Sequence, residues 1–246
     1  MLNRYSTAGN IKNLLHYHRL INIVKKKYLY FNLHSHHKAA TPDTVVLQSI
    51  YKNFEAIDGT GFYSAGLHPW YINENWQPQL QLLQITMQQQ SVWAVGECGL
   101  DKICPTLFTL QQEVFTQQLL LANRVNKPVI IHCVKAWQEV FTLLDEVAMQ
   151  VPVIFHGFAK NEILAKQILE KGYYLSFGKA LQQQHMQHLL KKIPLQHVLL
   201  ETDDAAISIE TVYNWAAQAL STDINSLSLQ LQKNAQTVFK NKKALL

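Results

Sequence analysis

Residues 28–37 read YLYFNLHSHH, an apolar run that ends in two histidines separated by one residue, His34 and His36. In an extended strand, residues i and i+2 point to the same face, so both imidazoles can converge on one point. Neutral imidazole nitrogen is a common metal ligand, and such a pair at a strand end can supply two ligands at once. The alternative is an ordinary pair of surface or core histidines. The same pattern, an apolar run followed by His, Glu or Asp, recurs along the chain and favours the metal interpretation.

From residue 28 onward, short apolar runs alternate with longer segments of helical periodicity, which is typical of a parallel α/β domain. Eight strands are predicted, at residues 28–34, 44–50, 61–67, 92–97, 128–132, 152–156, 173–177 and 197–201. Seven helices are predicted, at residues 76–90, 108–126, 136–149, 161–171, 181–192, 208–220 and 224–240. The interval from Ser49 to Gly61 is too short for a full helix with its loops, so the second crossover is predicted to be shortened. We therefore predict a (β/α)8 TIM-type barrel rather than an open sheet.

The composition fits one large globular domain. A length of 246 residues is about that of a single α/β barrel, and 48% hydrophobic residues is ordinary for a chain with a sizeable core. No apolar run reaches the roughly 18 residues that a membrane span needs. Three cysteines are an odd number and form no dense framework, which favours a reducing compartment and a cytoplasmic location.

The net charge of +5 is concentrated at the N-terminus. Residues 1–27 contain six basic residues and no acidic one, whereas the rest of the chain has sixteen basic and seventeen acidic residues. We interpret residues 1–27 as a basic N-terminal extension and residues 28–246 as the barrel. The extension has roughly helical apolar spacing, so an organelle presequence or a membrane-surface helix are alternatives to an accessory segment. The overall charge is therefore poor support for nucleic-acid binding by the barrel itself.

Polar donors end most of the predicted strands. They are His34 and His36, His68, Glu97 with Asp101 four residues on, His132, His156, and Glu201 with Asp203. In a parallel barrel the C-terminal strand ends meet on one rim, where the active sites of this fold lie. Any one of these residues alone would more often be an ordinary hydrogen-bonded polar group, but donors at six strand ends are difficult to attribute to chance.

So many imidazoles and carboxylates exceed the needs of one tetrahedral ion and suit a site with two divalent cations. Glu97 is the natural bridge, because a carboxylate can offer one oxygen to each ion. We expect His34, His36 and Asp203 to hold one ion, with His132 and His156 holding the other. A water molecule between two cations loses its proton near neutral pH, and Asp203 is suited to orient it and accept that proton as general base.

These motifs together resemble the TatD family of metal-dependent hydrolases, part of the wider amidohydrolase-like barrels. The motifs are His-Ser-His at 34–36, Gly-Leu-His-Pro at 66–69, Gly-Glu-Cys-Gly-Leu-Asp at 96–101, Lys-Pro-Val-Ile-Ile-His-Cys at 127–133, the histidine at 156 and Leu-Glu-Thr-Asp at 200–203. The similarity covers about residues 28–240. It implies a (β/α)8 barrel, a divalent-metal site and deoxyribonuclease or phosphodiesterase activity.

The resemblance also assigns residues. It implies that the metal ligands are His34, His36, Glu97, His132, His156 and Asp203. His68 matches an additional rim histidine, expected to bind substrate near the scissile phosphate; the alternative is a histidine that caps the loop before Pro69.

The chain departs from the family pattern in two important places. Asn32 stands where an Asp usually precedes the His-x-His motif. The residues from Asp204 to Ser208 lead almost directly into a helix, where the family usually has a long loop with basic residues. The loss of that loop makes polymeric DNA a less certain substrate than hydrolysis itself.

Three function classes follow. The favoured one is a Mg²⁺-, Mn²⁺- or Zn²⁺-dependent phosphodiesterase or nuclease, acting on DNA or a small phosphodiester with no obligate protein partner evident. A metal-dependent amidohydrolase or deaminase is the alternative, since those barrels share the first-strand histidines, two later histidines and a last-strand Asp. Many of them bridge two metals with a modified lysine, so Glu97 favours the phosphoesterase. A catalytically inactive binding barrel is the third class.

Overall fold

The computed structural model describes residues 30–38 and 41–240. The predicted extension over residues 1–27 therefore lies outside the described residues, and its separation from the barrel stays a prediction. None of the described helices is both long enough and apolar enough to cross a membrane.

Eight parallel strands form one sheet in chain order, which confirms the predicted barrel. The strands are β1 (Tyr30–Ser35), β2 (Thr44–Ile50), β3 (Phe62–Ala65), β4 (Val92–Asp101), β5 (Val129–Val134), β6 (Val153–Phe155), β7 (Tyr174–Phe177) and β8 (Val198–Leu200). The fourth strand is longer than predicted because residues 98–101 continue to pair with residues 131–134 of β5.

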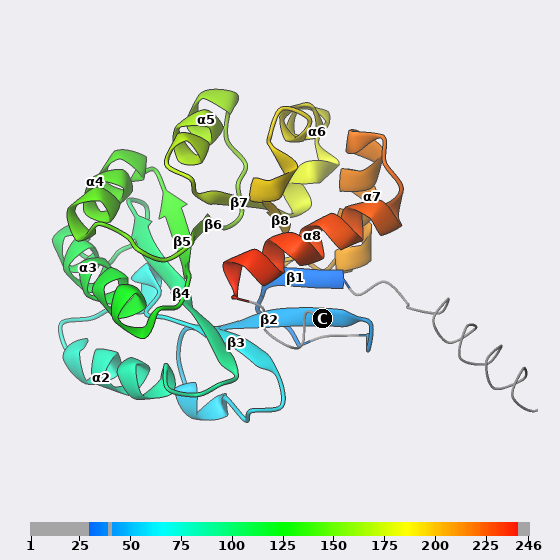
Figure 1. The fold of residues 1–246 in the computed structure, drawn as a ribbon. Helices are drawn as coiled ribbons and strands as arrows, with labels where there is room; N and C mark the ends of the chain where they lie inside the picture. The colour runs from blue at the N-terminus through cyan, green and yellow to red at the C-terminus, as the bar shows by residue number, and fades with distance from the viewer. Residues whose placement is uncertain (1–29, 39–40, 241–246) are drawn as a thin grey trace, which may run out of the picture.

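Helices surround the strands on most of the outer surface (Figure 1). They are α2 (Gln77–Thr86), α3 (Phe108–Val125), α4 (Trp137–Val147), α5 (Glu162–Glu170), α6 (Gln184–Leu190), α7 (Ile209–Leu220) and α8 (Ile224–Val238), with short 3-10 turns η1 (Phe54–Ala56), η2 (Pro69–Tyr71), η3 (Lys179–Gln182) and η4 (Leu195–His197). The Ser208 side chain accepts a hydrogen bond from the Thr211 amide and thereby caps the N-terminus of α7.

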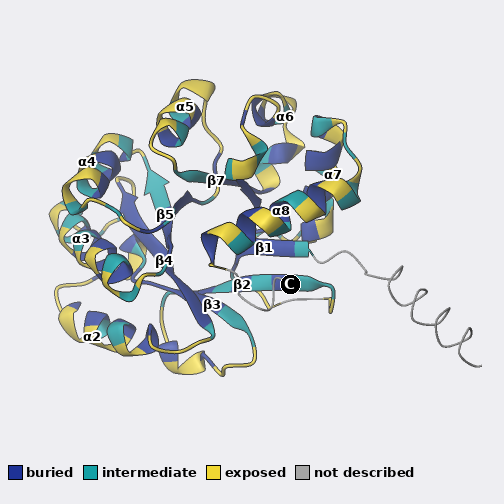
Figure 2. Cartoon of the chain, viewed as in Figure 1, coloured by how far each residue is buried: buried dark blue, intermediate teal, exposed yellow. Residues whose placement is uncertain are grey.

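The first two crossovers are short. Residues 51–61 connect β2 to β3 through η1, as predicted, and the link from β1 to β2 at residues 36–43 is shorter still, with no helix among its described residues. As a result β2 alternates between buried and half-buried residues, whereas β4 is buried along its whole length (Figure 2). The outer face of β2 is therefore not covered by any described helix.

Apolar side chains from six strands fill the barrel interior. Among them are Phe31, Leu33, Val45, Leu47, Ala94, Ile130, Ile154 and Leu199, all buried. A second and larger cluster lies between the strands and the helices, where α3, α4 and α7 contribute their apolar faces. This division between an inner core and an outer core is that of a (β/α)8 barrel.

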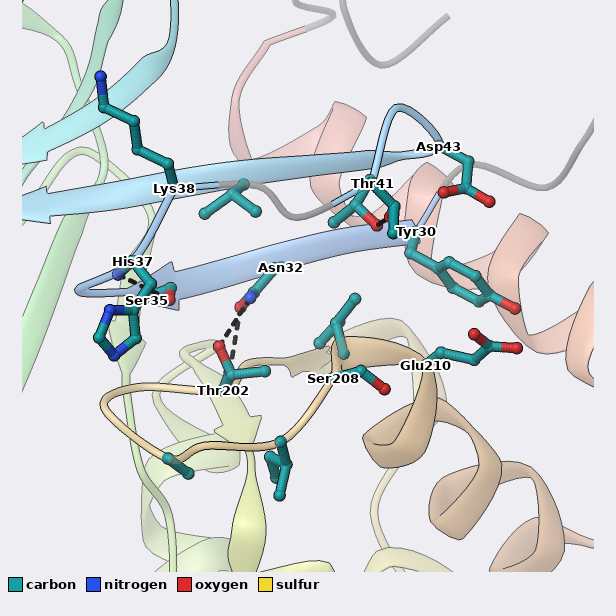
Figure 3. A pocket seen from close by; sticks show the side chains of 15 residues that line it. Tyr30, Asn32, Ser35, His37, Lys38, Thr41, Asp43, Thr202, Ser208 and Glu210 are labelled. Atoms are coloured by element: carbon teal, nitrogen blue, oxygen red, sulfur yellow. Dashed lines mark hydrogen bonds between the residues drawn. The ribbon is translucent and has the colours of Figure 1, made fainter.

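The barrel closes between β1 and the residues that follow β8. The backbone of residue Ser35 pairs with that of Asp203, and the His34 carbonyl accepts hydrogen bonds from the amides of Thr202 and Asp203. Beside this contact, the Asn32 amide donates to the Thr202 hydroxyl at 2.8 Å and accepts from the Thr202 backbone at 3.1 Å (Figure 3). A carboxylate could only accept, so the neutral side chain at position 32 suits this closure.

Candidate metal centre

The predicted site residues converge at the C-terminal rim of the barrel. Glu97 lies at the centre and is only 3% exposed. Five imidazole nitrogens lie 2.8–3.9 Å from its oxygens, namely Nε2 of His34, His36, His68 and His156 and Nδ1 of His132. Burial alone would raise the pKa of Glu97, but the surrounding histidines, His156 and His34 foremost, hold it well below its usual value.

The two oxygens of Glu97 face different groups of histidines. Oε2 is directed to the first-strand pair, 3.2 Å from His34 and 3.9 Å from His36. Oε1 is directed to the other side, 2.8 Å from both His132 and His156. A carboxylate with one oxygen on each side is arranged as a bridge between two positions.

A register shift brings His34 into the site. Phe31 and Leu33 both belong to the inner core, so strict alternation would turn His34 outward. The pairing of β1 with β2 shifts by one residue between Asn32 and Ser35, which changes the phase of the alternation. His34 is consequently fully buried and faces Glu97, and His36 follows it on the same side.

Asp203 completes the first-strand side of the site. Its Oδ1 lies 3.5 Å from Nε2 of His34 and 3.4 Å from Nε2 of His36. Although partial burial would raise the pKa of Asp203, the two histidines lower it. The residue adopts a left-handed backbone conformation with φ of 55°, and its amide and carbonyl are hydrogen-bonded to His34 and His36. The side chain is 40% exposed and thus accessible from the cavity.

Two further carboxylates orient the later histidines. Asp101 Oδ2 lies 3.0 Å from Nε2 of His132, and Glu201 Oε1 lies 3.4 Å from Nδ1 of His156 while accepting the Gly157 amide at 2.7 Å. When each histidine is neutral and donates to its outer carboxylate, its other nitrogen, which lies on the side of Glu97, is available as a metal ligand. Both acids stand at strand ends in the sequence, but only the distances to His132 and His156 reveal this role.

His68 has the opposite arrangement. Its Nδ1 accepts a hydrogen bond from the Trp70 amide, so the neutral ring carries its proton on Nε2, 3.2 Å from Glu97 Oε1. Burial lowers the pKa of His68, which favours this neutral form. The ring therefore presents a donor to the site.

Close packing of two strands sets the position of the ligands. At Gly99 (φ of 149°) a Cβ atom would lie 1.9 Å from the His132 carbonyl oxygen, so only glycine fits. This lets β4 and β5 approach closely where Glu97 and His132 meet.

The donor set fits divalent cations. Three groups have donor atoms within 4.8 Å of one another: His34, His36 and Glu97; His34, His156 and Asp203; and His68, Glu97 and His132. His34 is fully buried, and neither ring nitrogen makes a hydrogen bond of good geometry, as expected for a side chain placed for a metal. Burial would lower the pKa of His34, but Glu97 and Asp203 raise it to about 9. Mixed nitrogen and oxygen ligands suit Zn²⁺ or Mn²⁺.

A cavity of about 400 Å³ opens above these residues. Besides the ligands it is lined by Tyr51, Trp70 and Tyr71, which the sequence analysis did not single out. The Trp-Tyr pair directly after the His-Pro motif was the available signal, since two large aromatic residues follow a rim histidine there.

Comparison with known proteins is consistent with this geometry. The sequence model described as TatD related DNase matches residues 31–245. The chain belongs to the TatD family. This membership confirms the resemblance inferred from the motifs.

Several relatives match part of the chain. It is 33% identical over 162 residues to the uncharacterized metal-dependent hydrolase YabD of Bacillus subtilis, covering 63% of this chain and 64% of YabD. An uncharacterized metal-dependent hydrolase of Haemophilus influenzae is 32% identical over 151 residues, 57% of this chain and 58% of that protein. The 3'-5' ssDNA/RNA exonuclease TatD of Cronobacter turicensis is 33% identical over 147 residues, which cover 57% of this chain and 56% of that protein. Each match spans less than two thirds of the relative's own length.

Solved structures share the fold. The TatD homolog YJJV of Escherichia coli superposes with a TM-score of 0.75 at 21% identity, covering 86% of this chain and 98% of YJJV. A TatD family hydrolase of Entamoeba histolytica superposes with a TM-score of 0.73 at 14% identity, covering 87% of this chain and 99% of that protein.

Proposed function

We propose that this TatD-family chain is a divalent-metal-dependent hydrolase of phosphodiester bonds, with DNA or a short phosphodiester as substrate. The observation that carries the proposal is the buried Glu97 carboxylate, whose two oxygens face separate groups of imidazoles. The names of the relatives, metal-dependent hydrolase and exonuclease, agree with it. All three cysteines are unpaired, which supports a reducing compartment such as the cytoplasm.

We assign two cations to the site, bridged by Glu97. The ligands are His34, His36, Glu97, His132, His156 and Asp203. His156 lies in one group of close donor atoms with His34 and Asp203, whereas His132 lies in another with Glu97 and His68. When bound, divalent cations supply Lewis-acid activation of the phosphoryl group and of a water molecule.

The protein's own side chains complete the chemistry. Asp203 is held ionised by its histidine neighbours and exposed to the cavity, so it orients the attacking water and accepts its proton. His68 donates through Nε2–H, and in the complex this donor is suited to a phosphoryl oxygen near the scissile bond. Glu97 is too deeply buried and too tightly surrounded to act as the proton acceptor.

A metal-dependent amidohydrolase is the competing class. It is disfavoured because Glu97, and no lysine, holds the bridging position. A panel of amides and phosphodiesters tested with the same purified protein separates the two classes.

The decisive experiment compares Asp203→Asn with the wild type on thymidylyl-thymidine (TpT), a short phosphodiester, after chelation and reloading with Mn²⁺ or Zn²⁺. Asparagine keeps an oxygen donor but takes no proton near neutral pH, so we expect turnover to fall roughly 10²–10⁴-fold with much of the metal content retained. Asp145→Asn, the same change at an exposed remote site, is the matched control.

Two results would contradict the proposal. Near-normal turnover by metal-loaded Asp203→Asn would move the base to another group such as Glu201 or His68. Full turnover by the metal-free wild type would exclude metal-dependent hydrolysis altogether.

A further inference from the structure

Exposed aromatic side chains stand directly beside the metal centre. Tyr51 follows β2, Trp70 and Tyr71 lie in η2, and all three residues line the cavity. Trp70 is 47% exposed and Tyr71 is 50% exposed, although both residue types are costly to leave in water. Their rings share this cavity with Glu97 and His68.

Two of the tyrosine rings form a stacked pair. The ring centroids of Tyr51 and Tyr71 are 4.7 Å apart with an interplanar angle of 11°. Lys52 Nζ lies 5.4 Å from one centroid and 5.6 Å from the other. Because these distances are nearly equal, the ammonium lies beside the pair and not over the outer face of either ring. A flat ligand can therefore stack on the outer face of Tyr71. The Lys52 ammonium would then lie near the edge of that stack.

Trp70 and Tyr71 both contact residues of the metal centre. The Trp70 indole N–H donates to Asp101 Oδ2 at 2.7 Å, and the same oxygen faces Nε2 of His132. His68 lies with its ring centroid 5.7 Å from that of Tyr71 and 6.2 Å from that of Tyr51. Trp70 is thus hydrogen-bonded to the carboxylate that orients His132, and Tyr51 and Tyr71 both lie next to His68.

We infer that Tyr71 and Trp70 form a stacking surface for an unpaired nucleobase next to the scissile phosphodiester, with Lys52 contacting the adjacent phosphate. The inference deepens, and rests on, the proposed phosphodiester hydrolysis: it names the side chains of this chain that would position the base beside the scissile bond. A base within a duplex has both faces covered by its neighbours, whereas a frayed or single-stranded base can stack on an aromatic side chain. This surface also supplies binding contacts on a rim that lacks the basic loop after Asp203.

The test measures binding separately from catalysis. Isothermal titration of the full-length, EDTA-treated protein with TpT is compared with titration of the same compound whose 3′ base is replaced by hydrogen. We expect the wild type to prefer TpT by on the order of tenfold, the value of one base–aromatic stack. Tyr71→Leu should abolish most of this preference, Tyr71→Phe should retain it, and Ile163→Ala, at a residue 72% exposed on α5, should leave it unchanged.

The charge is tested with a thymidine pentanucleotide at several salt concentrations. Lys52→Gln should reduce the slope of log Kd against log salt by about 0.7, the contribution of one single-strand phosphate, whereas Lys233→Gln on α8 should not. These short ligands limit contributions from the basic residues 1–27.

The outcomes separate the two proposals. A base preference that is lost in Tyr71→Leu, in a protein that hydrolyses no phosphodiester, would support the stacking surface and reject the proposed function. No preference for TpT in the wild type, or an undiminished preference in Tyr71→Leu, would overturn the stacking surface even if TpT is hydrolysed.

Discussion

Tyr213→Phe tests how the barrel closes. The Tyr213 hydroxyl on α7 is fully buried, donates to the Phe31 carbonyl at 3.1 Å and accepts from the Phe31 amide at 3.2 Å. These backbone groups lie on the edge of β1 that faces β8, below the point where the two strands meet. Removing one oxygen atom therefore deprives two buried backbone groups of their partner.

The expected magnitude follows from these two contacts. An unsatisfied buried donor or acceptor costs about 1–3 kcal/mol, so we expect a loss of roughly 2–4 kcal/mol in the free energy of unfolding. At about 2–4 °C per kcal/mol for a chain of this size, Tm should fall by roughly 4–16 °C. Urea denaturation followed by circular dichroism should show a lower midpoint with an unchanged m-value.

Tyr174→Phe is the matched control. Tyr174 is half-buried, and its hydroxyl has no hydrogen-bond partner among the described residues, so its removal should change the free energy of unfolding by less than about 0.5 kcal/mol. If Tyr213→Phe were no more destabilised than this control, the hydroxyl would not be what satisfies the edge of β1.

Three further predictions concern the centre and the N-terminus. Glu97→Ala should lower the content of both ions, measured by elemental analysis, because the bridge is lost; full occupancy would exclude that role. His156→Ala should lose metal and activity together, and excess Mn²⁺ should partly restore both by mass action; activity without metal would refute this. Deletion of residues 1–27 should leave Tm and metal content intact but weaken non-specific DNA binding at fixed salt; unchanged binding would place the basic surface on the barrel.

Most of the barrel could be predicted from the sequence, because each strand is a short apolar run and each helix repeats its apolar residues at helical spacing. The short second crossover followed from the length between Ser49 and Gly61. The register shift in β1 could not be predicted, since it depends on pairing with β2. Simple alternation placed His34 and His36 on one face, but it did not explain why Leu33 is also inside.

The site was predictable in its residue types and less so in its contacts. Histidines and acids at strand ends converge because parallel strands share one rim. The partnership of Asp101 with His132, and the donor tautomer of His68, depend on distances across the barrel that no local pattern encodes. The hydrogen bonding of Asn32 across the barrel closure could not be predicted either, because its partner Thr202 lies 170 residues away in the chain.

The closure of the barrel has a consequence for folding kinetics. His34 and Asp203 bind each other through their backbones and face each other through their side chains, so the first and last strands must meet before the ligand set exists. Contacts of such long sequence separation form late. We therefore expect these contacts to be absent from the folding transition state, so that a cation leaves the folding rate nearly unchanged and slows unfolding. Metal availability would then set the lifetime of the native barrel and not the speed of its formation.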